Sequence, residues 1–125
     1  MQTIKLIEIS KSFKSKKALS NVNIEFKNNR INGLLGPNGS GKTTLFNIIA
    51  GFLSPDLGKI QLDENVLNEK SLSLRTKLGI SYLPQEASIF RDLSVYDNIF
   101  WIAELFYDKN NSIKVTENLI KQFSL

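Results

Sequence analysis

The first part of the sequence alternates hydrophobic and polar residues in the way that β-strands do. Residues 3–9 have a strand pattern, and residues 22–26 alternate strictly between apolar and polar side chains. The two asparagines at 28–29 suit a tight hairpin turn, because asparagine tolerates positive φ. We therefore expect a return strand over 31–35, and a further short strand over 59–62.

Helical patterns follow later in the chain. A helix is predicted from Lys42 to Ala50, with Gly51 placed to end it. A Ser-x-x-Asp start signal at Ser94 predicts a helix that extends to about Phe106. A last amphipathic helix is predicted over 112–123.

The order of these elements indicates the fold class. A turn is predicted over 63–65, and a strand over 80–83 that Pro84 ends. Strands come first and are followed by strands and helices in alternation. This order predicts an α/β fold in which an antiparallel β subdomain joins a parallel sheet.

Composition narrows the possible chemistry. The 125 residues fit one ordinary domain, and 42% apolar with 22% charged residues is typical of a globular protein. The sequence has no cysteine, which excludes a disulfide scaffold and a thiolate metal site. It has no histidine, which excludes Ser-His and Cys-His nucleophile pairs and histidine-bound metals.

Charge and hydropathy give little reason to expect nucleic acid or lipid as a direct partner. The net charge of +4 is small, and the lysine cluster within 11–17 is more typical of a solvated loop than of a phosphate patch. The longest apolar run, 48–53, is far shorter than the roughly 20 residues that span a bilayer. Charges interrupt residues 1–9, so this segment is not the apolar region of a signal peptide.

One glycine-rich segment indicates chemistry. Residues 36–43 match the pattern G-x-x-x-x-G-K-[ST] between a predicted apolar strand and a predicted helix, and a chance match has odds on the order of half a per cent. Glycines let the backbone N–H groups curve around phosphate oxygens, and the helix start adds its positive dipole end. The predicted phosphate-binding residues are Gly36, Pro37, Asn38, Gly39, Ser40, Gly41, Lys42, Thr43 and Thr44, with Thr43 also a Mg²⁺ ligand. The alternative is a glycine-rich turn that binds nothing.

This loop and three further segments resemble the ATPase domains of ABC transporters. The loop is similar to their Walker A motif, and residues 57–60 resemble the turn and strand after the first helix. The resemblance implies that Phe13, at the end of Ser-Lys-Ser-Phe, stacks on adenine, and that Gln85, in Tyr-Leu-Pro-Gln, ligates Mg²⁺ and senses the γ-phosphate. Phe13 could instead be an ordinary core or loop aromatic, and Gln85 a solvated residue after a strand.

The resemblance also implies a fold, cofactors and partners. The fold would be an ABC-type P-loop NTPase with an antiparallel β subdomain, an incomplete parallel α/β core and the start of the helical subdomain. The cofactors would be ATP and Mg²⁺, and the complete protein would form a homodimer. Residues 82–98 are similar to the ATPase subunits of bacterial lipopolysaccharide exporters, so Glu86–Asn98 would face membrane-spanning subunits at the cytoplasmic face of the inner membrane. Alternatives are another cargo, or a nucleic-acid repair ATPase, which the compact spacing from Gly36 to Gln85 disfavours.

The second half of such a domain is not found in these residues. The sequence has no Leu-Ser-Gly-Gly-Gln signature, no apolar run that ends in Asp-Glu, and no switch histidine, so no catalytic residue is assigned. Asp63-Glu64 follows an alternating segment too soon after the loop to be the catalytic pair. We expect residues 1–125 to be a partial domain that binds ATP but barely hydrolyses it. The pattern at 121–125 has no stop signal and favours a fragment, while a short module completed by another chain, or a non-hydrolysing nucleotide-binding module, is the alternative.

Overall fold

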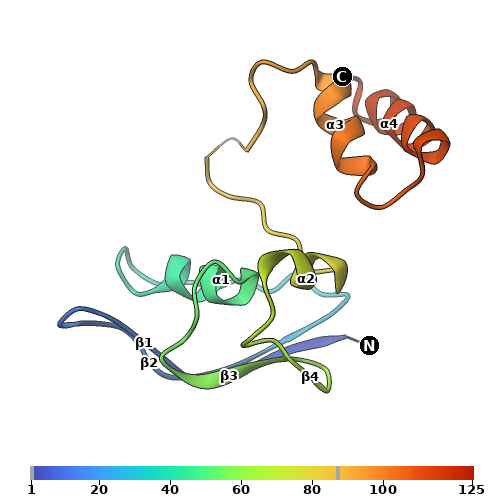
Figure 1. Ribbon diagram of the computed structural model, residues 1–125. Helices are drawn as coiled ribbons and strands as arrows, with labels where there is room; N and C mark the ends of the chain where they lie inside the picture. The colour runs from blue at the N-terminus through green and yellow to red at the C-terminus, as the bar shows by residue number, and fades with distance from the viewer. Residues whose placement is uncertain (1, 87) are drawn as a thin grey trace. The chain divides into compact units, whose positions relative to one another are not determined.

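The computed structural model describes residues 2–86 and 88–125, which form two compact units that divide after Tyr82 (Figure 1). The first unit is a four-stranded sheet with two helices, and the second unit is a helical pair preceded by a long loop. The antiparallel sheet followed by helices confirms the predicted fold class in its β subdomain. No helix in these two ranges has the length and apolar character needed to cross a membrane.

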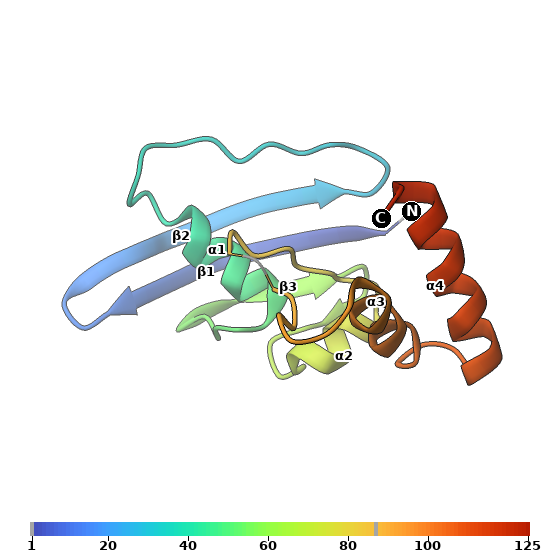
Figure 2. The ribbon, with the colours of Figure 1, turned by 90° about the horizontal axis from the view of Figure 1, so that it is seen from above.

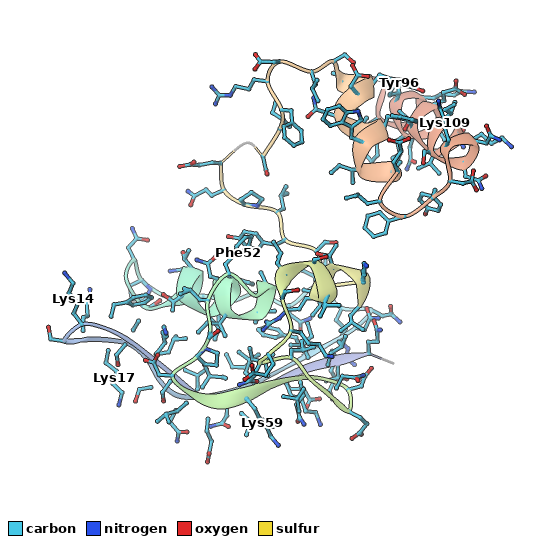
Figure 3. The ribbon with its side chains drawn as sticks, viewed as in Figure 1. Lys14, Lys17, Phe52, Lys59, Tyr96 and Lys109 are labelled. Atoms are coloured by element: carbon cyan, nitrogen blue, oxygen red, sulfur yellow. The ribbon has the colours of Figure 1, made fainter. Side chains whose placement is uncertain are left out.

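The sheet of the first unit has the strand order β2-β1-β3-β4, and each neighbouring pair is antiparallel. Both helices of this unit lie on one face of the sheet, as Figures 1 and 2 show, while Lys59 points from β3 to the opposite face (Figure 3). The core therefore lies between the sheet and α1. The elements are β1 (Thr3–Phe13), β2 (Lys16–Lys27), α1 (Lys42–Ala50), β3 (Leu57–Leu62), β4 (Asn65–Val66) and α2 (Leu72–Lys77).

A bulge in β1 brings its apolar residues to the helix-covered face. In a regular strand, Leu6 and Ile9 would point to opposite faces, because an odd number of positions separates them. Both are buried in this sheet, because Glu8 has φ 55° and forms a bulge that shifts the register of β1 against its neighbours. Gly58 of β3 fits against this bulge with φ +88°, where a Cβ atom would lie 2.4 Å from the carbonyl oxygen of Ile7. The buried apolar cluster is Leu6, Ile9, Leu19, Leu45, Ile48, Ile49, Ile60, Leu62 and Leu67.

Two of the predicted strands are wrong. The asparagine turn is present, with Asn29 at φ 61°, but residues 31–35 then leave the sheet, and Ile31 and Leu35 are 104% and 94% exposed. Residues 80–83 are also not a strand. Both segments have strand-like sequences, yet a strand exists only where a neighbour completes its hydrogen-bond ladder. The described residues supply antiparallel partners for β1 to β4 alone.

The first helix follows its local signals closely. α1 covers Lys42–Ala50 as predicted, and Gly51 ends it in the left-handed conformation, with its N–H donating to the carbonyl of Asn47 at 3.0 Å. The six-residue α2 was not predicted. Its only strong local signal is the N-cap Ser71, whose hydroxyl accepts a hydrogen bond from the N–H of Leu74.

The second unit contains α3 (Val95–Ala103) and α4 (Lys109–Phe123). The predicted cap of α3 is confirmed, since the Ser94 hydroxyl accepts a hydrogen bond from the N–H of Asp97 at 3.0 Å. α3 ends at Ala103 and not at Phe106, where a turn replaces the last helical residues. α4 starts earlier than predicted because Asp108 caps it, and Ser124 ends it in the left-handed conformation without a glycine.

Candidate nucleotide-binding site

The glycine-rich loop folds back on itself before α1 begins. Gly39 and Gly41 have φ +81° and +92°, values that glycine adopts without strain. The N–H of Ser40 donates to the carbonyl of Pro37 at 3.3 Å. A Cβ atom on Gly36 would lie only 2.8 Å from the Ser40 hydroxyl oxygen, so the two ends of the loop are close together.

Gly41 also fixes the loop against the sheet. A Cβ atom at this position would lie 2.6 Å from the carbonyl oxygen of Ala18 and 2.8 Å from a methyl carbon of Leu19, both on β2. Position 41 therefore requires glycine for two reasons: its φ is positive, and the backbone of β2 approaches it closely. This contact places the N-terminus of α1 directly beside β2.

Lys42 closes the loop with its side chain. The ammonium group donates to the carbonyl oxygens of Gly36 and Pro37, at 2.7 and 2.8 Å. These bonds hold one positive charge over the loop instead of leaving it on a mobile side chain. The charge therefore lies where the loop backbone and the first turn of α1 meet.

The start of α1 has the electrostatic character of an anion site. Its N-cap is Gly41, no side chain caps it, and its first turn contains no acidic residue. The helix dipole and the first N–H groups therefore favour a negative charge at this end. Thr43 is exposed and Thr44 is half-buried in the same turn, so the Thr43 hydroxyl is open to a ligand from solvent. Phosphate oxygens and a divalent cation fit this set of donors and acceptors.

Phe13 lies near this loop along the β1–β2 hairpin. Leu19, which contacts Gly41, pairs with Lys11, and Phe13 is two residues further along β1, about 7 Å at the usual rise of a strand. The Phe13 ring is 46% exposed, and the Lys11 ammonium lies 5.9 Å from its centroid. Lys14 lies at the tip of the same hairpin, and Lys17 lies near the start of β2 (Figure 3). The hairpin that contacts Gly41 thus also carries a partly exposed aromatic ring.

The position of this hairpin is fixed by Asp56. Its carboxylate accepts hydrogen bonds from the Lys11 ammonium and from the N–H of Ser12, both at 2.7 Å. The Lys11 hydrogen bond, and next the Ser12 N–H, hold the pKa of Asp56 below its usual value.

Gln85 lies in the second unit. It is exposed and directly follows Pro84, as the sequence analysis expected. Its role as a Mg²⁺ ligand beside Thr43 stays a prediction.

A buried arginine at the far end of α1 was missed in the sequence. Arg75 of α2 is 1% exposed, and its guanidinium donates to the carbonyl oxygens of Ile48 and Ile49 at 2.6 and 2.8 Å. It also donates to the carbonyls of Leu67 at 2.6 Å and Lys70 at 2.9 Å. Burial lowers the pKa of Arg75 from its ordinary value, because desolvation penalises the charged form. No local signal marks this residue, since its α1 acceptors are 26 and 27 positions away in the chain.

A glycine-rich loop closed by a lysine at the start of a helix is the arrangement of P-loop proteins. The model of the ABC transporter family matches residues 19–125. The lipopolysaccharide export system ATP-binding protein LptB of Haemophilus influenzae is 41% identical over 119 residues, which cover 94% of this chain and 49% of that protein. LptB of Escherichia coli K12 is 41% identical over 105 residues, which cover 84% of this chain and 44% of that protein.

Solved structures with a similar fold are also ATP-binding cassettes. A dimeric ATP-binding cassette in a post-hydrolysis state with ADP and Pi is similar with a TM-score of 0.80 and 26% identity, over 98% of this chain and 57% of that one. An ATP-binding cassette in its ADP conformation is similar with a TM-score of 0.74 and 30% identity, over 92% of this chain and 46% of that one. The chain belongs to the ABC transporter family. It spans about half the length of the curated relatives that it matches.

Proposed function

We propose that this chain binds ATP with Mg²⁺ through residues 36–44, as part of the ATP-binding subunit of a transporter. The observation that carries the proposal is the loop closed by the Lys42 ammonium on the carbonyls of Gly36 and Pro37, beside an uncapped helix start. Backbone N–H groups would hold the phosphates, and Lys42 would face the β- and γ-phosphates. Thr43 and Gln85 would hold the metal, while Thr44 would add a phosphate contact.

Adenine would stack on Phe13. The partial exposure of its ring supports this role, because stacking needs a flat apolar surface and few hydrogen bonds. Bound Mg²⁺ would neutralise phosphate charge.

Hydrolysis by these 125 residues is expected to be very slow. They include the phosphate cradle and the two metal ligands, but no apolar run ending in Asp-Glu that would orient the attacking water. The loss of such groups commonly costs factors of about 10² to 10⁴ in rate. A phosphate-release assay that found ordinary ATPase turnover in the purified chain would refute this part of the proposal.

The experiment that tests the site compares two lysines. Lys42→Ala removes the ammonium over the loop, whereas Lys59→Ala removes an exposed ammonium on the opposite face of the sheet (Figure 3). A hydrogen bond to a charged group is worth about 1.5–3 kcal/mol, so Lys42→Ala should weaken MgATP binding at least about tenfold in a calorimetric titration. Lys59→Ala should bind as the unchanged protein does. Equal affinities in all three proteins would remove the assignment.

Relatives named for lipopolysaccharide export support the partners that we propose. The complete subunit would form a homodimer and drive lipopolysaccharide export from the cytoplasmic face of the inner membrane, with Glu86–Asn98 against membrane-spanning subunits. Ile89 and Phe90 support this surface, because their apolar side chains are 63% and 58% exposed. Phe90→Asp should abolish co-fractionation with inner membranes, and Leu57→Asp, at an even more exposed apolar position on β3, should not. Retention of the Phe90 variant on membranes would exclude this surface.

A further inference from the structure

The carbonyl groups that end α1 are divided between its own backbone and Arg75. The carbonyl of Asn47 accepts the N–H groups of Gly51 and Phe52, at 3.0 and 2.9 Å. The next two carbonyls, of Ile48 and Ile49, accept the guanidinium of Arg75. A helix end buried in the core needs a partner for each such group, and a cation at this end also complements the helix dipole. The direction of α1 is therefore set at its C-terminus by one side chain.

Arg75 has no carboxylate partner in any ion pair among the described residues. All four of its side-chain hydrogen bonds go to backbone carbonyls in two separate segments, the end of α1 and the loop that contains Leu67 and Lys70. Arginine suits this role because its planar group presents several donors in fixed directions. A buried charge used in this way acts as a structural joint between segments.

The backbone of the same residue holds the segment that follows α2. The carbonyl of Arg75 accepts the N–H groups of Leu78 and Ile80, at 3.1 and 3.0 Å. A second contact between the same two parts of the unit is aromatic: the rings of Phe52 and Tyr82 meet edge to face with centroids 5.4 Å apart. Residues 78–82 are thus joined to the C-terminal end of α1 at two places.

α1 connects this joint to the phosphate loop. The helix has nine residues, so its two ends are about 13 Å apart at the usual rise. Four of its residues, Leu45, Ile48, Ile49 and Ala50, are buried, which makes the helix a firm element and not a flexible linker. A ligand that fixes the N-terminus of α1 also restricts its C-terminus. It thereby restricts the segments that are hydrogen-bonded to Arg75.

We propose that Arg75 is a positioning residue that couples nucleotide binding at the start of α1 to the order of residues 78–82, the segment that leads to Gln85. This inference rests on the proposed function, because it takes residues 36–44 as the nucleotide site. Binding of nucleotide and ordering of this segment are then linked, and by linkage each favours the other to the same extent.

Hydrogen exchange at the amides of Leu78, Gly79 and Ile80 tests the coupling, because each of these groups donates a backbone hydrogen bond. In the unchanged chain, saturating MgATP should slow exchange at these amides by about fivefold or more. In Arg75→Lys, which keeps the charge but loses the planar fork, the slowing should fall below about twofold, and the affinity for MgATP should fall by about three- to tenfold.

Two control variants separate coupling from stability. Lys77→Met removes an exposed positive charge from the same helix and should leave both the affinity and the slowing unchanged. Ile60→Ala removes buried volume from β3, lowers stability, and should keep the MgATP-dependent slowing at residues 78–80 when measured below its own unfolding midpoint. A general loss of stability would abolish the effect in Ile60→Ala as well.

The outcomes are distinct. If the unchanged chain binds MgATP but residues 78–80 exchange at the same rate with and without it, the coupling is refuted, whether or not Arg75→Lys folds. If Arg75→Lys binds MgATP and retains the full slowing, Arg75 is not the joint. If the unchanged chain binds no nucleotide, while Lys42→Ala behaves identically, the proposed function fails and this inference fails with it.

Discussion

Replacing Gly41 by alanine would force a methyl group between the glycine-rich loop and β2. The residue has φ +92°, and an L-residue in this conformation costs about 1–2 kcal/mol. The new Cβ atom would also lie 2.6 Å from the carbonyl oxygen of Ala18, which must move, and overpacking of this kind costs about 1–3 kcal/mol. Together these effects predict a loss of about 2–5 kcal/mol in the free energy of unfolding of the first unit.

Gly39 is the matched control because it shares the backbone conformation without the contact. Its φ is +81°, and a Cβ atom there would meet nothing within 4 Å. Gly39→Ala should therefore lose only the conformational part, about 1–2 kcal/mol. Urea unfolding of both variants should separate them by about 1–3 kcal/mol, and in a unit of this size each 1 kcal/mol lowers the Tm by about 4–8 °C. Equal losses would refute the argument that Gly41 anchors the loop on Ala18.

Three further measurements test other contacts of the fold. Asp56→Asn should remove a stabilisation that is fully present above pH 3.8, the ordinary pKa of the group. This stabilisation is lost as the pH falls through the lowered pKa of the folded state. The unchanged protein should therefore have a higher Tm than Asp56→Asn near pH 6, and the difference should disappear in strong acid. Arg75→Met should lose about 3–5 kcal/mol of unfolding free energy, because it leaves buried carbonyls without donors. Lys77→Met, at an exposed position of the same helix, should lose less than about 0.5 kcal/mol. Similar losses in the two variants would contradict the structural role of the buried guanidinium. Asn98→Leu should speed hydrogen exchange at the N–H of Phe90, which the Asn98 side chain accepts at 2.8 Å, and unchanged exchange would show that this bond does not order the loop.

The parts of the fold that depend on neighbouring residues could be predicted from the sequence. α1 begins and ends as expected because Gly41 and Gly51, both local in the sequence, mark its two ends. The start of α3 follows from the N-cap residue Ser94 alone. The glycine-rich loop is equally local, and Gly39 and Gly41 have the positive φ that glycine adopts without strain.

The parts that depend on distant partners could not be predicted. The apolar run at 31–35 has the pattern of a strand, yet strand formation depends on which other segments are available to pair with it. The interaction of Arg75 with α1 spans 26 and 27 positions, and nothing around residue 75 distinguishes it from a solvated basic residue. The bulge at Glu8 likewise depends on the close approach of Gly58 from β3.

The hydrogen bonds of the Lys42 ammonium to two loop carbonyls have a thermodynamic consequence. A free lysine side chain gives up to about 2 kcal/mol of rotamer entropy when it is immobilised. In this chain much of that loss occurs when the protein folds, so less of it would be subtracted from the affinity for the proposed phosphate ligand. The loop is thus preorganised for the proposed phosphate ligand, and conditions that loosen the loop should weaken binding of that ligand before they unfold the sheet.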